Sequence, residues 1–303
     1  MIKINKDTNI GILYGGWSNE REISLESGEV VFKTLKDAGY SVFLCDLKNN
    51  QDDLINFVHK NSIGIVFNLI HGTGGEDGTV QSWLDDIGVN YVGSDTKSSK
   101  VSFSKIMTKL KWLDNGLKTP DYIGNIIEHE NLNLIFSGTN KYVLKPDKSG
   151  SSVGIKILNN SKELSMSLSS VNYHNEYFVE EYAEGYEYTA PIIGDIVFPI
   201  IKIETKREFY DYQAKYIDDD TSFTFPEFKS DMLEKIESTC LKAFKVLGCK
   251  DWGRVDFFID KDNEISLIEI NTIPGMTDHS LVPMSASHIN ISYIELIEKI
   301  LSQ

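Results

Sequence analysis

The sequence has few cysteines, no long apolar run and no excess of basic residues, and each absence excludes a class of protein. The three cysteines are an odd number without a C-x-x-C pair, so neither a disulfide framework nor a zinc knuckle is expected. No stretch reaches the roughly 18 apolar residues of a membrane-spanning helix. Residues 1–9 lack the apolar segment of a signal peptide, so we expect a cytoplasmic protein.

The charge is one-sided. Lys and Arg number 30 whereas Asp and Glu number 45, which gives a net charge of −15. Such a chain repels phosphate backbones and anionic lipid surfaces, so we expect no nucleic-acid partner and no membrane partner. A small anionic ligand would therefore need a few basic groups concentrated in one place. With 303 residues, the chain is long enough for two or three domains and a sizeable core.

Strand-like and helical segments alternate over roughly the first 95 residues, which is typical of βαβ units and predicts a parallel sheet. The expected strands are 10–14, 41–46, 64–70 and 90–92, and the expected helices are 24–38 and 81–87. A Ser- and Lys-rich linker is expected over 94–100, followed by one helix over 101–115.

The rest of the chain is more mixed. Strands are expected at 141–145, 154–158 and 177–181, and over 187–203 with a turn at Gly194-Asp195. Helices are expected at 162–171 and 230–247. The polar stretch 204–223 is long for a connection inside a compact domain, which indicates a functional lid or a disordered segment.

Two strand-like segments joined by a short polar loop predict a β-hairpin, over 252–260 and 264–271. With 261–264 as the loop, Asp256 faces Glu269 and Arg254 faces Asn271 on one side of the hairpin. Opposed carboxylates repel one another unless they are neutralised. Two carboxylates and an amide oxygen suit Mg²⁺, although a solvent-facing strand with ordinary surface charges explains the pattern too. The other side is expected in the core: Val255, Phe257, Ile268 and Ile270.

A second candidate site begins at Lys145, the end of an expected strand. The loop that follows contains Gly150, Ser151, Ser152 and Gly154, whose small side chains allow backbone N–H groups to close around phosphate oxygens. Lys145 would supply the positive charge that the whole chain lacks. The Walker A spacing is absent, and an ordinary solvated hairpin loop is the alternative.

A glycine-rich turn follows the third expected strand and begins at His71. Its spacing does not fit a dinucleotide-binding fingerprint, because Gly72 and Gly74 would need a glycine where Asp77 stands. The pair Glu76-Asp77 would also repel a pyrophosphate. His71 is either a ligand-binding residue or a turn residue that bonds to backbone.

Two other loops carry polar groups. Glu20 lies between the first strand and the first helix, where it could meet a cationic ligand group or simply complement the helix dipole. The loop after Asn271 contains Thr277 and Ser280, whose hydroxyls could hold a carboxylate together with backbone amides. By itself this second segment is only a loop.

Together, seven segments in this order resemble the D-alanine–D-alanine ligases of the ATP-grasp superfamily. They span nearly the whole chain: GGWSNEREISLESG (15–28), HGTGGEDGTVQ (71–81), YVLKPDKSGSSVG (142–154), EYTAPI (187–192), FYDYQAKY (209–216), GCKDWGRVDFFID (248–260) and IEINTIPGMTDHSLVPMSA (268–286). The resemblance implies an α/β, three-domain ATP-grasp fold. Its domains would be an N-terminal parallel-sheet domain (1–101), a central domain (102–187) and a C-terminal domain (188–303) with the lid loop 204–223.

The resemblance also implies the reaction, in which ATP phosphorylates one D-alanine and the amine of a second attacks the acyl phosphate. The product would be D-alanyl-D-alanine for peptidoglycan precursors. The implied cofactors are ATP and two Mg²⁺, with Mn²⁺ as a substitute and activation by K⁺. The implied partners are ATP, D-alanine and a second copy of the chain in a homodimer. Relatives that make D-alanyl-D-lactate differ in the lid, so Tyr216 favours the dipeptide.

The family's site residues can be carried over one by one. The resemblance places Lys105, Lys145, Ser152, Glu180, Glu181, Ala183, Glu187, Lys215 and Phe258 on ATP, and Asp256, Glu269 and Asn271 on the metal. It places Glu20, Ser151, Arg254, Lys215 and Tyr216 in catalysis, and Glu20, His71, Arg254, Gly275, Ser280 and Leu281 on the substrates. The lid would exclude water from the acyl phosphate.

The sequence departs from the family pattern in a few places, among them Asp147-Lys148-Ser149 before the phosphate loop. None of these changes removes an implied ligand. Three other functions remain as alternatives: a ligase with D-lactate or D-serine as second substrate, a catalytically silent nucleotide-binding module, and a kinase that leaves a stable phosphorylated product.

Overall fold

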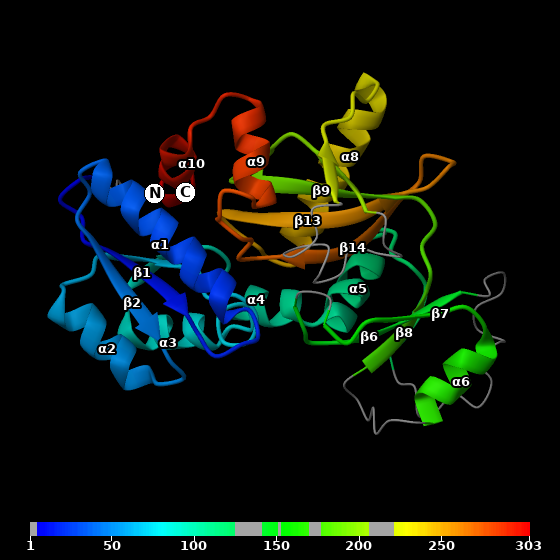
Figure 1. Ribbon diagram of the computed structural model, residues 1–303, viewed down its shortest axis with the longest axis horizontal. Coiled ribbons are helices and arrows are strands. Elements are labelled where there is room, and N and C mark those ends of the chain that lie inside the picture. Colours follow the sequence, from blue (N-terminus) through cyan, green and yellow to red (C-terminus); the bar gives the residue numbers. More distant parts are fainter. Residues whose placement is uncertain (1–4, 125–140, 151–152, 170–176, 206–220) are drawn as a thin grey trace.

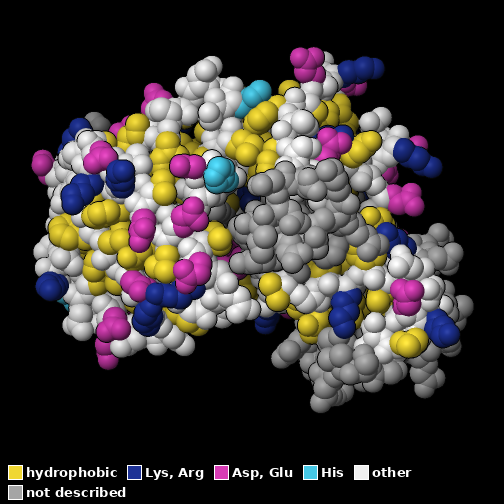
Figure 2. All heavy atoms as spheres, in the orientation of Figure 1, with side chains coloured by type: hydrophobic (Ala, Val, Ile, Leu, Met, Phe, Trp, Pro, Cys, Tyr) yellow, Lys and Arg dark blue, Asp and Glu magenta, His cyan; other side chains and the backbone are white. Residues whose placement is uncertain are grey.

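The computed structural model describes residues 5–124, 141–150, 153–169, 177–205 and 221–303, which form three sheets with flanking helices (Figure 1). None of the helices in these ranges combines the length and the apolar character needed to cross a membrane. Acidic and basic side chains are interspersed over the face shown in Figure 2.

The N-terminal sheet is parallel, as predicted. Its order is β2-β1-β3-β4, built from β1 (Ile10–Gly15), β2 (Val42–Leu47), β3 (Ile65–Asn68) and β4 (Asn90–Val92). Its helices are α1 (Arg21–Asp37), α2 (Gln51–Lys60) and α3 (Thr79–Ile87). The sequence interpretation missed α2, a short helix that buries only Leu54 and Val58 completely.

The helix predicted over 101–115 is in fact two helices, α4 (Thr96–Phe103) and α5 (Lys105–Asp114). Asp95 caps α4 by accepting the N–H of Ser98, so the predicted linker over 94–100 was wrong. Ser104 breaks the run with an extended backbone and caps α5 by accepting the N–H of Met107. Asp95 and Ser104 both have short polar side chains. Such side chains bond to nearby backbone groups and are therefore unfavourable inside a helix but favourable at its first residue.

The central sheet is antiparallel, with the order β5-β8-β6-β7. It consists of β5 (Tyr122–Ile123), β6 (Tyr142–Pro146), β7 (Lys156–Leu158) and β8 (Tyr177–Glu181), and α6 (Ser161–Ser169) packs against it. The predicted strands in this region are confirmed.

The C-terminal sheet is the largest, with the order β12-β11-β9-β13-β14 and with β10 paired to β9. Its strands are β9 (Tyr186–Ile193), β10 (Ile196–Val197), β11 (Ile201–Glu204), β12 (Ser222–Thr224), β13 (Trp252–Ile259) and β14 (Ile265–Asn271). The predicted turn at Gly194-Asp195 is confirmed. Helix α8 (Ser230–Val246) contributes Ile236, Cys240, Ala243 and Phe244 to its core.

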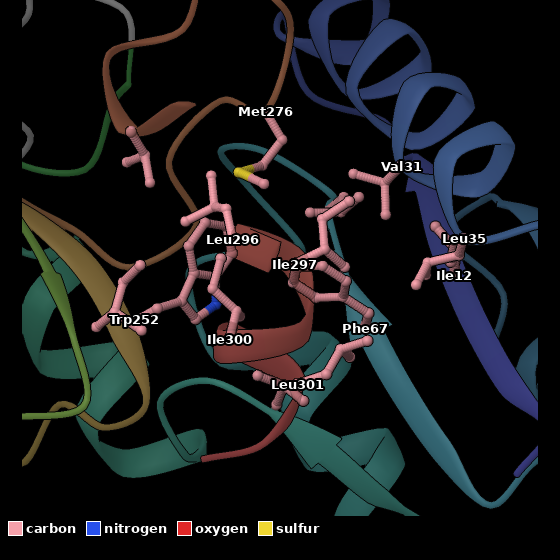
Figure 3. Packing of buried hydrophobic residues seen from close by; sticks show 14 of the residues in the cluster. Ile12, Val31, Leu35, Phe67, Trp252, Met276, Leu296, Ile297, Ile300 and Leu301 are labelled. Carbon is pink, nitrogen blue, oxygen red and sulfur yellow. The ribbon is translucent and has the colours of Figure 1, made fainter. Parts of the chain in front are cut away.

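The last helices, α9 (Leu281–His288) and α10 (Tyr293–Leu301), return the chain to the N-terminal sheet. In Figure 3, Ile297 and Ile300 of α10 lie between Phe67 of the N-terminal sheet and Trp252 of β13. The rings of Phe67 and Trp252 meet edge to face with centroids 5.5 Å apart. The first and last parts of the chain therefore share one core, while the domain boundaries at 101 and 187 stay predictions.

Candidate active site

The hairpin of β13 and β14 has the predicted register at its polar end. Asp256 pairs with Glu269, and Arg254 pairs with Asn271. The turn is one residue longer than predicted, because Ile259 pairs with Ile265. A β-bulge next to Asp256 compensates for the longer turn, so the two carboxylates still face each other.

The bulge changes which side chains reach the core. Val255, Phe257 and Ile270 are buried as predicted, but Ile268 is only half-buried and the core position belongs to Leu267. The prediction for Ile268 was wrong, because Ile268 is the extra residue of the bulge and strict alternation fails there.

Asp256 is held from two neighbouring strands. Its Oδ1 accepts hydrogen bonds from the hydroxyl of Thr189 on β9 (2.5 Å) and from Nε of Arg254 (2.8 Å). Its Oδ2 accepts from Nη2 of Arg254 at 2.7 Å. Asp256 is only 4% exposed, so these bonds fix a carboxylate that water does not solvate freely.

Glu269 faces a lysine from α5. The Nζ of Lys105 lies 3.3 Å from Oε2 of Glu269 and donates to the carbonyl oxygen of Ser149 at 2.7 Å. One lysine thus connects the carboxylate hairpin to the loop predicted to bind phosphate.

The donor set fits a hard divalent cation. Asp256, Glu269 and Asn271 offer carboxylate and amide oxygens on one side of the hairpin, the ligands that Mg²⁺ prefers. In the described part of the chain, no three His, Cys, Asp or Glu side chains form a metal-ligand cluster. Two carboxylates with one amide still suit Mg²⁺, because this ion keeps waters and substrate phosphates as its other ligands.

Lys145, at the end of β6, pairs with Glu180 of β8, whose other oxygen lies 2.8 Å from Nζ of Lys109. Burial alone would raise the pKa of Glu180, but the charges of Lys109 and Lys145 outweigh it and hold the pKa below its ordinary value. The Glu180 side chain is therefore an ionised partner of two lysines.

The remaining described residues that are predicted to bind ATP are Glu181, Ala183, Glu187 and Phe258. Glu181 and Ala183 are half-buried where the chain passes from β8 to β9. Glu187 pairs with Phe258 across β9 and β13, so the two side chains share one side of the C-terminal sheet.

Three loops converge on Glu20. A Cβ on Gly72 would lie 2.5 Å from Oε2 of Glu20, and a Cβ on Gly150 would collide with the same oxygen. The hydroxyl of Ser18 donates to the carbonyl oxygen of His71 at 2.7 Å. The segments 15–28, 71–81 and 142–154, which carry part of the family resemblance, therefore meet at the carboxylate of Glu20.

His71 is buried beneath this meeting point. Its Nδ1 donates to the carbonyl oxygen of Ile273 at 2.8 Å, and its Nε2 lies 3.4 Å from the hydroxyl of Ser27. Burial lowers the pKa of His71, and Glu20 only partly opposes this. His71 thus ties the N-terminal sheet to the loop after β14.

The loop after β14 ends at α9. Gly275 comes close to Ser280, because a Cβ on Gly275 would lie 2.7 Å from Ser280 Oγ. Ser280 precedes α9, and its Oγ accepts the N–H of Thr277 at 2.9 Å. Leu281 is the first residue of α9 and is buried. A helix N-terminus beside a serine is a favourable place for a carboxylate.

Some predicted residues lie outside the described part of the chain: Ser151, Ser152, Lys215, Tyr216 and residues 206–220 of the predicted lid.

The sequence interpretation missed several supporting residues. Asp147 is one: its carboxylate accepts the Ser104 hydroxyl through both oxygens at 2.9 Å and the N–H of Ile106 at 2.8 Å. An acidic side chain at the N-terminus of α5 is stabilising, and it fixes the helix that carries Lys105. Glu76 is another: it accepts the N–H of Gly72 at 2.7 Å, and burial together with Glu20 raises its pKa to about 8. Their only sequence signal was an acidic residue in a glycine- or serine-rich loop.

A parallel α/β domain precedes two antiparallel sheets, and Lys105 of α5 faces the carboxylate of Glu269 in the C-terminal sheet. This is the arrangement of the ATP-grasp enzymes. The family model "D-ala D-ala ligase C-terminus" matches residues 114–302, and "D-ala D-ala ligase N-terminus" matches residues 48–94. The chain belongs to the D-alanine–D-alanine ligase family.

Individual relatives cover nearly the whole chain. The D-alanine–D-alanine ligase of Marinomonas sp. (strain MWYL1) is 38% identical over 99% of this chain and 96% of its own. The structure of the Bacillus anthracis enzyme complexed with ATP is 33% identical, with a TM-score of 0.84, and the match covers 98% of this chain and 97% of that one. The VanG D-Ala:D-Ser ligase from Enterococcus faecalis is 26% identical, with a TM-score of 0.82 and coverage of 98% and 99%.

Proposed function

We propose that this protein is an ATP-dependent ligase that joins two D-alanine molecules into D-alanyl-D-alanine for peptidoglycan precursors. The observation that carries the proposal is the register of Asp256 with Glu269, with Lys105 facing Glu269. Family membership and the likeness to an ATP-complexed relative support ATP as the phosphate donor.

The nucleotide side of the site consists of opposite charges. Lys105 and Lys145 bind the phosphates, while Asp256, Glu269 and Asn271 would hold Mg²⁺. When bound there, Mg²⁺ would supply positive charge to the phosphates during transfer. A carboxylate oxygen of the first D-alanine attacks the γ-phosphorus and ADP leaves, which gives an acyl phosphate.

The second half-reaction takes place beside the N-terminal domain. Glu20 binds the ammonium of the first D-alanine, and Ser280 with the N-terminus of α9 binds the carboxylate of the second. The neutral amine of the second D-alanine attacks the acyl carbon, Arg254 stabilises the oxyanion, and phosphate leaves together with the proton that the amine loses. The proposal also includes two Mg²⁺ ions, which Mn²⁺ can replace, and activation by K⁺. It further includes a homodimer and a cytoplasmic location.

A second candidate has the same first half-reaction and a different second substrate. The likeness to a D-Ala:D-Ser ligase favours testing D-serine, and D-lactate is the other candidate. The test measures ADP release with D-alanine alone and with each competitor added, and identifies the products. A ligase for two D-alanines turns over with D-alanine alone, whereas a mixed-product ligase needs the competitor.

Two other functions predict different products. A silent nucleotide-binding module releases no ADP under any of these conditions. A kinase leaves a stable phosphorylated product, whereas the proposed ligase releases free phosphate together with the dipeptide.

A further inference from the structure

A third lysine, Lys109, is buried next to Lys145, one of the two lysines proposed to bind the phosphates. Lys109 is on α5, four residues after Lys105, and its side chain is only 1% exposed. Its Nζ lies 2.8 Å from one oxygen of Glu180, and Lys145 pairs with the other oxygen. Two cations therefore share one buried carboxylate.

The surroundings of Lys109 show that it carries a proton on every donor position. Besides Glu180, its Nζ bonds to Oγ1 of Thr119 at 2.6 Å and to the carbonyl oxygen of Pro120 at 3.3 Å. The hydroxyl hydrogen of Thr119 is used on the carbonyl oxygen of Leu267 at 2.8 Å, so Nζ must be the donor to Thr119. Three acceptors around one nitrogen match the three hydrogens of an ammonium ion.

The aromatic rings of Tyr122 and Phe178 also face this ammonium. Their centroids lie 5.4 and 6.0 Å from Nζ, distances at which a ring face attracts a cation. Burial lowers the pKa of Lys109, and the charge and hydrogen bond of Glu180 oppose this effect. Glu180 and the two rings thus stabilise the positive charge of Lys109 at a buried position.

We propose that Lys109 is a positioning residue that cancels the charge of Glu180, so that Lys145 keeps a full positive charge for the nucleotide phosphates. This inference rests on the proposed function, because it takes a nucleotide to be the ligand beside Lys145. With Lys109 present, the three side chains carry a net charge of +1. Without Lys109, Glu180 and Lys145 neutralise each other.

The two lysines of α5 then have separate tasks. Lys105, the first residue of α5, reaches Glu269 and the carbonyl oxygen of Ser149. Lys109 is buried beside Glu180 and acts on the phosphates only through Lys145. In a chain with a net charge of −15, this arrangement concentrates positive charge at one place.

The test compares two ligands that differ only in their phosphates. Binding of ADP and of adenosine is measured without added metal for the full-length wild type and for Lys109→Met, Lys109→Met/Glu180→Gln and Lys111→Met. Lys111 is the control, because it lies on the same helix and forms no ion pair to Glu180. The ratio of the two dissociation constants isolates the contribution of the phosphates.

We expect Lys109→Met to weaken ADP binding about tenfold and to change adenosine binding less than about twofold, because a lost charge acts on charged ligands. The double variant removes one charge of each sign and returns the ratio of the two dissociation constants to within about threefold of the wild-type ratio, whereas a lost contact of Glu180 with adenine would weaken both ligands alike. Lys111→Met binds both ligands like the wild type. If Lys109→Met does not fold, the double variant decides by the same threefold limit.

Three results would overturn the inference: unchanged ADP binding in Lys109→Met, an equal loss for adenosine, or a double variant whose ratio of the two dissociation constants differs from the wild-type ratio about tenfold. A wild-type protein that does not bind ADP contradicts the proposed function itself. The two failures are therefore distinguishable.

Discussion

Asp256 and Glu269 face each other across β13 and β14, next to a bulge that compensates for the longer turn. Two opposed carboxylates destabilise a hairpin unless something neutralises them. Arg254 binds Asp256, and Lys105 faces Glu269. The proposed ligase would bind a divalent cation at this pair, next to these two contacts.

Replacing Glu269 by Gln should lower the rate of ADP release by at least about 100-fold, because the variant loses charge at the proposed metal site. The measurement is the turnover rate at saturating ATP and D-alanine. Glu264→Gln is the matched control, since Glu264 lies in the turn of the same hairpin and faces Lys235. Near-normal turnover in Glu269→Gln would contradict the metal assignment.

Gly150→Ala should reduce turnover about tenfold or more, because its Cβ would displace the carboxylate of Glu20. The Michaelis constant for the first D-alanine should rise, while the melting temperature changes little. Gly124→Ala is the control, because its Cβ would meet its nearest neighbours only at 3.6 Å. Equal activity of the two variants would show that Glu20 has no fixed position in catalysis.

The pKa of His71 is lowered from 6.5 by burial, so the folded protein favours the neutral ring. Its contribution to stability is present above pH 6.5 and is lost as the pH falls from there towards the pKa of the folded state. We expect unfolding free energy to decline less steeply from pH 7.5 to 5.5 in His71→Gln than in the wild type. His59→Gln, at an exposed site on α2, should keep the wild-type slope. Identical slopes in all three proteins would contradict the burial effect.

Ile300→Ala should destabilise the protein by about 2–5 kcal/mol, since Ile300 is fully buried in the core shared by α10 and the N-terminal sheet. Chemical denaturation measures the change. Ile196→Ala is the control at a site that is 64% exposed, and it should change stability by less than about 0.5 kcal/mol. A small effect at Ile300 would mean that α10 does not join the first and last parts of the chain.

The sequence predicted the features that depend on local periodicity. Alternation along β13 and β14 was enough to pair Asp256 with Glu269, even though the turn length was wrong by one residue. The bulge at Ile268 had no sequence signal, because an apolar residue fits a strand whether or not it has a partner.

Local periodicity does not predict which residues far apart in the sequence contact each other. Nothing in the sequence near Lys109 indicates that its nitrogen meets Glu180, which lies 71 residues later. The split between α4 and α5 was missed because Ser104 is a cap only when its backbone is extended. Such contacts follow from packing between sheets, and a single sequence read by periodicity does not contain that information.

The decisive measurement is the product balance with ATP, Mg²⁺ and D-alanine as the only substrates. We predict that ADP, free phosphate and D-alanyl-D-alanine form in equal amounts. If the wild-type protein releases no ADP with D-alanine alone, or releases ADP without forming the dipeptide, the proposed ligase function is wrong.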